Sequence, residues 1–173
     1  MFIEFQAPLI GQLTNNLCWY AAFEMIEAWY NTLLPARPTA FTPTQMAHLR
    51  RLNWGVQPSA IADFAKFMGL TIKFATPDTA SLGRLLQQYG PLWYPAQNNG
   101  YLPVGSHHVV VIRGIRGTDL MINDPSPVGS GAKRVIPAAA FFQQLKPLNN
   151  QFLVMLKNSK PDTTAIYNDL KVR

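Results

Sequence analysis

The sequence predicts an α+β domain in which helices near the N-terminus pack against an antiparallel twisted sheet from the second half of the chain. Two observations support this class. Apolar residues recur at helical spacing through most of the sequence before Gly90, whereas later segments are short runs of valine, isoleucine, leucine and aromatic residues separated by turn residues. Helices followed by strands, with little alternation between them, are typical of α+β folds.

The length and composition fit one globular domain. A chain of 173 residues buries about two-thirds of the surface that it exposes when unfolded. Hydrophobic residues make up 48% and charged residues 14% of the chain, which argues against intrinsic disorder. No apolar run reaches the ~18 residues of a membrane span. We expect residues 1–157 to form the domain and the polar residues 158–173 to form a peripheral tail.

The first helical segment follows a short expected strand, MFIEF, and a loop. Apolar residues from Cys18 to Tyr30 recur at spacings of three and four, which predicts one broad apolar helix face. Three prolines then end this segment. Three further helices are expected, at about Pro43 to Leu52, Ser59 to Gly69 and Asp78 to Gly90. Ser59 is a candidate cap and Gly69 a candidate stop for the second of these. The strand LTIKFAT is expected between the second and the third.

Strands dominate the remaining sequence. The turn GIRGTD joins two of them, HHVVVIRGI and DLMIND, so these two are expected to pair as a hairpin. Such a pairing brings the start of the first strand beside the end of the second. The other expected strands are PLWYPAQ, KRVIP and QFLVMLK, and one helix, AAAFFQQL, interrupts them.

The net charge of +6 does not indicate a nucleic-acid binder, because the basic residues are scattered. Arg50-Arg51 and Lys133-Arg134 are the only adjacent basic pairs, and aromatic and basic residues do not alternate as they do in single-strand binders. Charge of this size usually serves solubility or steering toward a partner. We expect no nucleic-acid partner, and an acidic protein partner explains the charge at least as well.

Cys18 is the only cysteine and lies where a loop enters the first predicted helix. The unpaired N–H groups at a helix N-terminus stabilise a thiolate, which is the nucleophilic form of the side chain. Taken alone, a packing role for Cys18 as a small buried hydrophobic residue is at least as good an explanation as a nucleophilic role. A single cysteine forms no internal disulfide, so the fold does not depend on an oxidising compartment.

A nucleophilic thiol needs a base, and the chain has three histidines. His48 lies in an expected amphipathic helix and is interpreted as a surface or packing residue. His107 and His108 open an apolar strand at the rim of the sheet, where strand-end packing and metal binding are the alternative roles. Neighbouring strand residues point to opposite faces, so the two rings would chelate a metal poorly. No metal or cofactor is expected.

Two further groups complete a possible site. Asn123 and Asp124 end the strand paired with the histidine strand, and Asp124 in particular would orient an imidazole and stabilise its charged form. The alternative for Asp124 is an ordinary turn residue before proline. Gln12 lies in the loop before Cys18, where its amide and the backbone N–H of Cys18 are candidate donors to an oxyanion.

Taken together, these residues resemble the papain-like cysteine peptidases. That family carries a glutamine six residues before a Cys-Trp pair, as Gln12 stands before Cys18 and Trp19. Its histidine opens a strand with glycine six positions later, and HVVVIRG matches this from His108 to Gly114. The preceding histidine is one residue out of register, so the resemblance implies that His108 is the base.

The third member of the triad is asparagine in papain and aspartate before proline in bacterial branches of the family. Those branches include secreted avirulence proteases of plant pathogens and double-glycine leader peptidases of bacteriocin exporters. The segment INDP resembles this bacterial form, which implies Asp124 rather than Asn123. YGPLWY, before the histidine strand, also resembles these branches.

The resemblance covers residues 11–125, and more loosely the chain up to residue 157. It implies a two-lobe papain-like fold with helices in one lobe, a twisted sheet in the other and the active site in the cleft between them. It implies that Cys18, His108, Asp124 and Gln12 are the catalytic residues. The chain departs from papain in lacking the cysteine-rich segment before the nucleophile and the structural disulfides.

The expected function is a cysteine endopeptidase that acts as a bacterial effector or toxin domain, for example between competing bacteria, and cuts a particular intracellular protein. The class implies a protein substrate and a dedicated immunity or inhibitor protein. The N-terminal segment has an early Glu4 and no basic start, so we expect delivery without a cleaved signal peptide and action in a reducing cytoplasm. The alternatives are a cysteine amidase acting on peptidoglycan, an acyl or glutamyl transferase, and a non-catalytic binding module.

Overall fold

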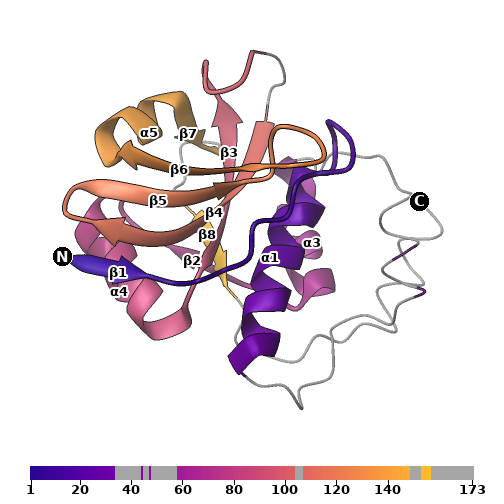
Figure 1. The fold of residues 1–173 in the computed structure, drawn as a ribbon, viewed down its shortest axis with the longest axis horizontal. Coiled ribbons are helices and arrows are strands. Elements are labelled where there is room, and N and C mark those ends of the chain that lie inside the picture. The colour runs from indigo at the N-terminus through magenta and orange to yellow at the C-terminus, as the bar shows by residue number, and fades with distance from the viewer. Residues whose placement is uncertain (34–43, 45–46, 48–57, 104–106, 149–152, 157–173) are drawn as a thin grey trace.

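The computed structural model describes residues 1–33, 44, 47, 58–103, 107–148 and 153–156 (Figure 1). The helix expected from Pro43 to Leu52, with His48 in it, lies outside the described residues except at positions 44 and 47. The expected tail, residues 158–173, also lies outside them.

The described strands form one antiparallel sheet. Its main path runs β2-β8-β3-β4-β5-β6, while β1 pairs with β4 and β7 pairs with β3. The segments expected as strands are confirmed, and one further three-residue strand, β7, follows α5 directly. The bounds are β1 Phe2–Glu4, β2 Thr71–Phe74, β3 Leu92–Asn98, β4 His107–Arg116, β5 Asp119–Asp124, β6 Ala132–Pro137, β7 Leu145–Pro147 and β8 Leu153–Leu156.

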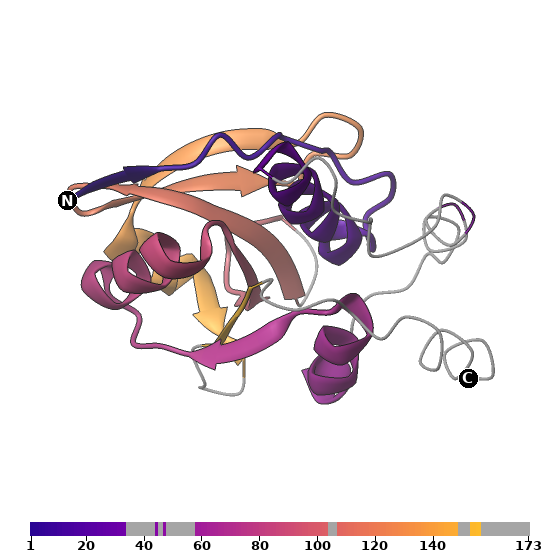
Figure 2. The same cartoon turned by 90° about the horizontal axis from the view of Figure 1, so that it is seen from below.

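Helices cover both faces of this sheet. They are α1 Cys18–Leu33, α3 Ile61–Met68, α4 Thr79–Tyr89 and α5 Ala138–Gln144, and a 3-10 turn, η1 Pro58–Ala60, leads into α3. One hydrophobic cluster joins α1 and α3 to the sheet, and a second joins α4 and α5 to it. Figure 2 shows strands of the sheet between α1 and α4. The predicted α+β class is therefore confirmed.

The ends of the helices follow local rules. Gly69 ends α3 with φ of 63°, in the left-handed region that glycine adopts without strain, as the sequence predicts. Asp78 caps α4, because its carboxylate accepts the Ser81 N–H at 2.7 Å. The prediction that Ser59 caps α3 is wrong: the η1 turn comes first, and Ala60 takes the cap position with no side-chain bond.

The strand β4 sets the geometry of the site because its residues alternate between the two clusters. Val109 and Val111 belong to the cluster with α1, whereas Val110 and Ile112 belong to the cluster with α4 and α5. By the same alternation, neighbouring histidines at the start of β4 have different surroundings. His108 is buried and His107 is exposed.

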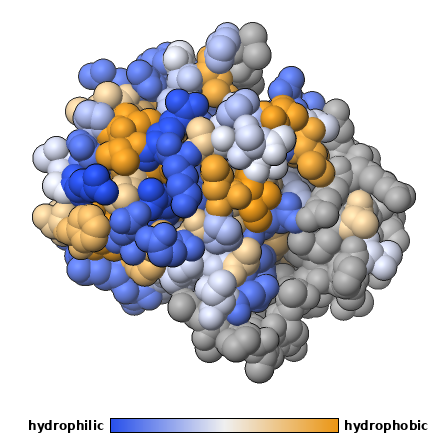
Figure 3. All heavy atoms as spheres, in the orientation of Figure 1, coloured by the Kyte–Doolittle hydropathy of each residue, from blue (hydrophilic) through white to orange (hydrophobic). Residues whose placement is uncertain are grey.

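The face seen in Figure 1 carries small apolar patches separated by polar side chains, as Figure 3 shows. This mixture is typical of an ordinary protein surface. Among the described helices, none is long enough and apolar enough to cross a bilayer.

Candidate active site

Cys18 is the first residue of α1 and is 9% exposed. The preceding turn places it there: the Leu17 N–H donates to the carbonyl of Thr14 at 3.2 Å, and the Ala21 N–H donates to that of Leu17 at 3.1 Å. The indole N–H of Trp93 on β3 donates to the carbonyl of Trp19 at 3.0 Å. The first turn of the helix is thus bonded to the sheet directly beside the thiol.

His108 and Asp124 are brought together by the β4–β5 hairpin. Val111 lies opposite Asn123 in this pairing, and continuing the register by one residue puts Asp124 opposite Val110. His108 is two residues from Val110, so its side chain and that of Asp124 lie on the same face. The His108 Nε2 and Asp124 Oδ1 atoms are 2.7 Å apart. The expected hairpin therefore places the two side chains in direct contact.

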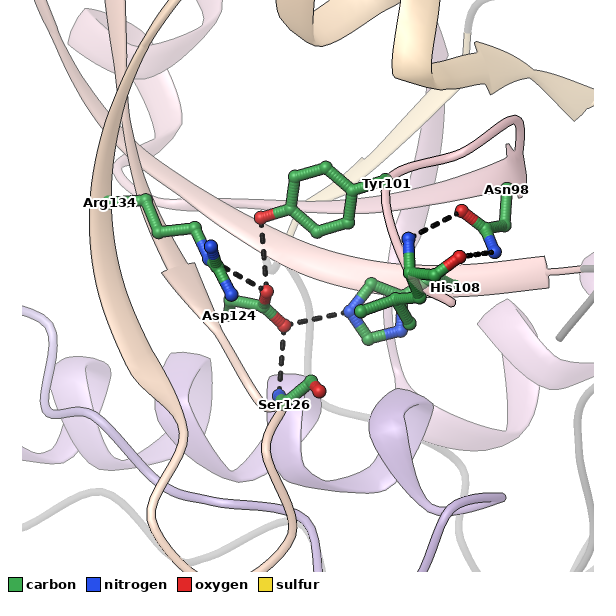
Figure 4. Close-up of polar contacts among 7 residues, drawn as sticks. Asn98, Tyr101, His108, Asp124, Ser126 and Arg134 are labelled. Atoms are coloured by element: carbon green, nitrogen blue, oxygen red, sulfur yellow. Dashed lines mark hydrogen bonds and ion pairs between the residues drawn. The ribbon is translucent and has the colours of Figure 1, made fainter. Parts of the chain in front are cut away.

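Both oxygens of the Asp124 carboxylate are fully engaged (Figure 4). Oδ1 contacts His108 Nε2 at 2.7 Å and accepts the backbone N–H of Ser126 at 2.8 Å. Oδ2 accepts the Tyr101 hydroxyl at 3.0 Å and the Arg134 Nε–H at 3.1 Å. Four partners account for the acceptor capacity of a carboxylate, although the side chain is completely buried.

These contacts determine the charge of the carboxylate. Burial raises the pKa of Asp124. The hydrogen bond to His108, the His108 charge, and the bonds from Ser126 and Tyr101 lower this pKa by more than burial raises it, so the net pKa lies below the usual range. Asp124 is therefore an anion at neutral pH.

His108 carries the matching positive charge. Burial lowers its pKa, but the hydrogen bonds with Asp124 and with Cys18, together with the charges of both groups, raise the pKa of His108 to about 9. Because Nε2 faces Asp124, the hydrogen bond with Cys18 falls to Nδ1. Cys18, His108 and Asp124 thus form a continuous chain of polar contacts across one imidazole.

Asn123 does not face this imidazole. Its Nδ2 donates to the carbonyls of Ala7 at 3.0 Å and Pro8 at 3.1 Å, on the side of β5 away from Asp124. The residue therefore joins the N-terminal segment to the sheet, and Asp124 alone of the two contacts His108.

Gln12 lies on the loop before α1 and is 4% exposed. Its N–H donates to the Pro125 carbonyl at 2.9 Å, and its own carbonyl accepts the Gly129 N–H at 2.8 Å. Gly11 permits this close approach, since a Cβ there would lie 2.5 Å from the backbone nitrogen of Ser130. The loop that carries Gln12 is thereby held on the loop that follows Asp124.

Three residues of this site were not predicted from the sequence. Ser126, Tyr101 and Arg134 all bond to Asp124. In the sequence, Arg134 stands out only as part of a basic pair. A register for β5 and β6 would have found it, because Arg134 lies opposite Ile122, whose side chain shares a face with Asp124. No group of three or more histidine, cysteine, aspartate or glutamate side chains in the described part of the chain is arranged to hold a metal ion.

The comparison with solved structures supports the architecture. A putative C39-like peptidase from Bacillus anthracis matches with a TM-score of 0.57 and 15% identity, over 92% of this chain and 100% of that one. The peptidase domain of Streptococcus ComA, a bifunctional ABC transporter of a quorum-sensing pathway, matches with a TM-score of 0.56 and 17% identity, over 88% of this chain and 100% of that one. At these identities the likeness concerns the fold.

A third similar structure is a double glycine motif protease from an AMS/PCAT transporter in complex with the leader peptide. It matches with a TM-score of 0.53 and 20% identity, over 89% of this chain and 92% of that one. No curated protein sequence matches the chain. The family described as papain-like cysteine protease AvrRpt2 matches residues 1–146, well over half of the chain. The chain therefore belongs to this family, and it is a papain-like cysteine endopeptidase.

Proposed function

We propose that Cys18 is the nucleophile of this endopeptidase, His108 its general acid and base, and Asp124 the group that orients the imidazole. Gln12 and the backbone N–H of Cys18 are the proposed donors to the oxyanion. The observation that carries the proposal is the 2.7 Å contact between His108 Nε2 and Asp124 Oδ1, with Cys18 on the other ring nitrogen. One imidazole thereby joins a thiol to a buried carboxylate.

The proposed reaction begins with the thiolate of Cys18 and the imidazolium of His108. The sulfur attacks the carbonyl carbon of the scissile peptide, a C–S bond forms, and the electron pair of the C=O double bond moves to oxygen. The side-chain amide N–H of Gln12 and the backbone N–H of Cys18 donate hydrogen bonds that stabilise this oxyanion. The oxyanion then collapses, the C–N bond breaks, and His108 Nδ1 protonates the leaving amine.

Hydrolysis of the resulting thioester restores the enzyme. His108, now neutral, accepts a proton from water through Nδ1, and the hydroxide oxygen attacks the thioester carbon. The second oxyanion collapses, the C–S bond breaks, and the carboxylic product leaves the thiolate of Cys18. Throughout, Asp124 holds the proton on Nε2 and so keeps Nδ1 available for both transfers.

We propose further that the substrate is a particular intracellular protein and that the enzyme is a bacterial effector or toxin domain. Membership of the AvrRpt2 family supports this role. The single cysteine also supports it, because no disulfide has to survive a reducing cytoplasm. An immunity or inhibitor protein in the producing cell is the partner that such an activity would require.

The test compares the purified protein with Cys18→Ala on three substrates: a whole-cell lysate, a double-glycine leader peptide and purified sacculi. New protein N-termini that appear in the lysate only with the unmodified enzyme would support the proposal, and one dominant cleavage would support a specific target. The leader peptide is included because one structural neighbour was solved in complex with one. Release of peptides from sacculi without cleavage in the lysate would contradict the protein target.

A further inference from the structure

Two segments outside the proposed triad converge on the oxygen of Asp124 that His108 does not contact. Tyr101 comes from the loop after β3 and Arg134 from β6, and both bond to Oδ2 (Figure 4). The remaining oxygen, Oδ1, is shared by His108 and the backbone of Ser126. The carboxylate is therefore held at both ends.

We propose that Tyr101 and Arg134 are positioning residues of the active centre, which act through Asp124 to fix the orientation and the charge of the pair it forms with His108. This inference rests on the proposed function, because it assigns the two residues a part in the same reaction.

The geometry of a carboxylate explains how contacts at Oδ2 set the orientation of Oδ1. The group turns about its Cβ–Cγ bond, and donors on only one oxygen restrain that rotation poorly. Donors at 3.0 and 3.1 Å on Oδ2 fix the plane of the carboxylate, and hence the direction in which Oδ1 meets the ring of His108.

The charge of Arg134 matters most at the stage at which His108 has given up its proton. Asp124 is completely buried, so without a cation it would be driven toward its neutral form. Arg134 keeps its charge at every stage, since a guanidinium does not deprotonate in proteins. Its side chain is 42% exposed, so water solvates part of the guanidinium and stabilises its charge. The carboxylate thus stays anionic and holds the proton on Nε2.

Tyr101 also covers the contact between His108 and Asp124. Its ring stacks on the imidazole, with 6.0 Å between centroids and 30° between planes, and the Arg134 guanidinium lies 5.4 Å from the Tyr101 centroid. The loop is held in place by Asn98, whose side chain accepts the Leu102 N–H at 2.9 Å and donates to the Leu102 carbonyl at 3.1 Å. The burial of Tyr101 itself and the charge of Asp124 raise the pKa of Tyr101, so its hydroxyl remains a donor at neutral pH.

The charged and titratable groups around Asp124 in the described residues come from four places. His108 lies on β4, Tyr101 on the loop after β3 and Arg134 on β6, and Cys18 on α1 reaches Asp124 only through His108. Lys133 is next to Arg134 in sequence but lies opposite Asn123 and is exposed. It therefore offers a charge-matched control on the same strand.

The test uses alkylation of the full chain by iodoacetamide, which needs no known substrate and reports only on Cys18. The variants are Tyr101→Phe, Arg134→Met and Arg134→Lys. The controls are Lys133→Met, which removes a neighbouring charge, and Tyr94→Phe, which removes a buried hydroxyl bonded to the Leu145 carbonyl. The alkylation rate is measured against pH for each, with circular dichroism to establish folding.

Loss of either donor makes Asp124 a stronger acceptor for the imidazolium N–H and so raises the pKa of His108. The high-pH limb of the profile, at which the imidazolium gives up its proton, should therefore move upward by about one pH unit, the size expected for one charged hydrogen bond. Arg134→Lys should restore part of the shift, and neither control should move the limb. Profiles of folded Tyr101→Phe and Arg134→Met that match the unmodified protein would overturn the inference, as would equal shifts in the controls. If the Arg134 variant does not fold, Tyr101→Phe decides alone.

Failure of the proposed function has a different signature. If Cys18→Ala retains full proteolysis of the lysate, the proposed nucleophile is wrong and this inference fails with it. If Cys18→Ala is inactive while the limb is unmoved in both Tyr101→Phe and Arg134→Met, the proposed nucleophile stands and only the positioning role is lost.

Discussion

Asp124 ends β5, and the loop that follows it is bonded to the loop that carries Gln12, yet the two side chains are held in opposite ways. Asp124 has a donor or ring nitrogen at every acceptor position. Gln12 is positioned by its backbone, through Pro125 and Gly129, and its buried Oε1 has no hydrogen-bond partner among the described residues. The contrast indicates that the carboxylate of Asp124 is held in one orientation before substrate binds. The side-chain amide of Gln12, in contrast, has no hydrogen bond to its oxygen among the described residues.

The largest effect should come from Gln12. Gln12→Ala removes one proposed oxyanion donor while the backbone bonds that join the two loops remain, so kcat should fall by ~10²–10³ with little change in KM. The measurement is steady-state kinetics on a cleavable substrate. Undiminished turnover in a folded variant would remove Gln12 from the mechanism and would leave its burial as a packing feature.

The next effect concerns the two histidines. At pH 6 to 7 an ordinary thiol is only about one per cent ionised, so loss of the imidazolium in His108→Ala should slow alkylation of Cys18 by up to ~10²-fold. His107→Ala is the matched control, because this neighbour is exposed on the other side of the strand. The reverse ranking would show that His107 is the partner of the thiol.

A smaller effect should follow the charge of Asp124. The carboxylate helps to raise the pKa of His108 to about 9, so activity should fall as pH rises through about 9, where the imidazolium loses its proton. Asp124→Asn keeps a group to orient the ring but removes the charge, so this high-pH limb should move to lower pH by about one unit. Asp124→Ala should lose more activity, because nothing then orients the ring. An unmoved limb in kcat/KM against pH would contradict the assignment.

The smallest effect on activity should come from Asn123. Asn123→Ala removes two hydrogen bonds to the Ala7 and Pro8 carbonyls, so the free energy of unfolding should fall by about 1–3 kcal/mol while kcat/KM changes little. Urea denaturation followed by circular dichroism measures the first, and the kinetic assay measures the second. A large loss of activity in the folded variant would make Asn123 part of the active centre.

Local sequence signals predicted the elements that carry the proposed triad. Apolar spacing predicted the helix that Cys18 begins, and the turn at Gly117 between two apolar strands predicted the β4–β5 hairpin. The hairpin then sufficed to bring His108 and Asp124 together, because both residues lie close to one short connection. The roles assigned to these residues stay predictions.

The parts that escaped prediction depend on longer-range geometry. Arg134 reaches Asp124 only through the register of β6 on β5, across a loop whose length alone does not set that register. Tyr101 reaches it through a loop whose shape depends on Asn98 bonding to Leu102. The wrong prediction for Ser59 has a local cause. Whether this residue caps α3 or lies in a 3-10 turn depends on the path by which the chain enters the helix, which the sequence pattern does not determine.

The two backbone bonds between Gln12 and the loop after Asp124 have a consequence for how this chain tolerates changes in loop length. Adding or removing a residue between Asp124 and Gly129 would shift the proposed oxyanion donor together with the carboxylate. A change in the length of either loop in this chain would therefore disturb both proposed groups at once. New target preferences can arise with less disturbance in surface segments that are not tied to either loop.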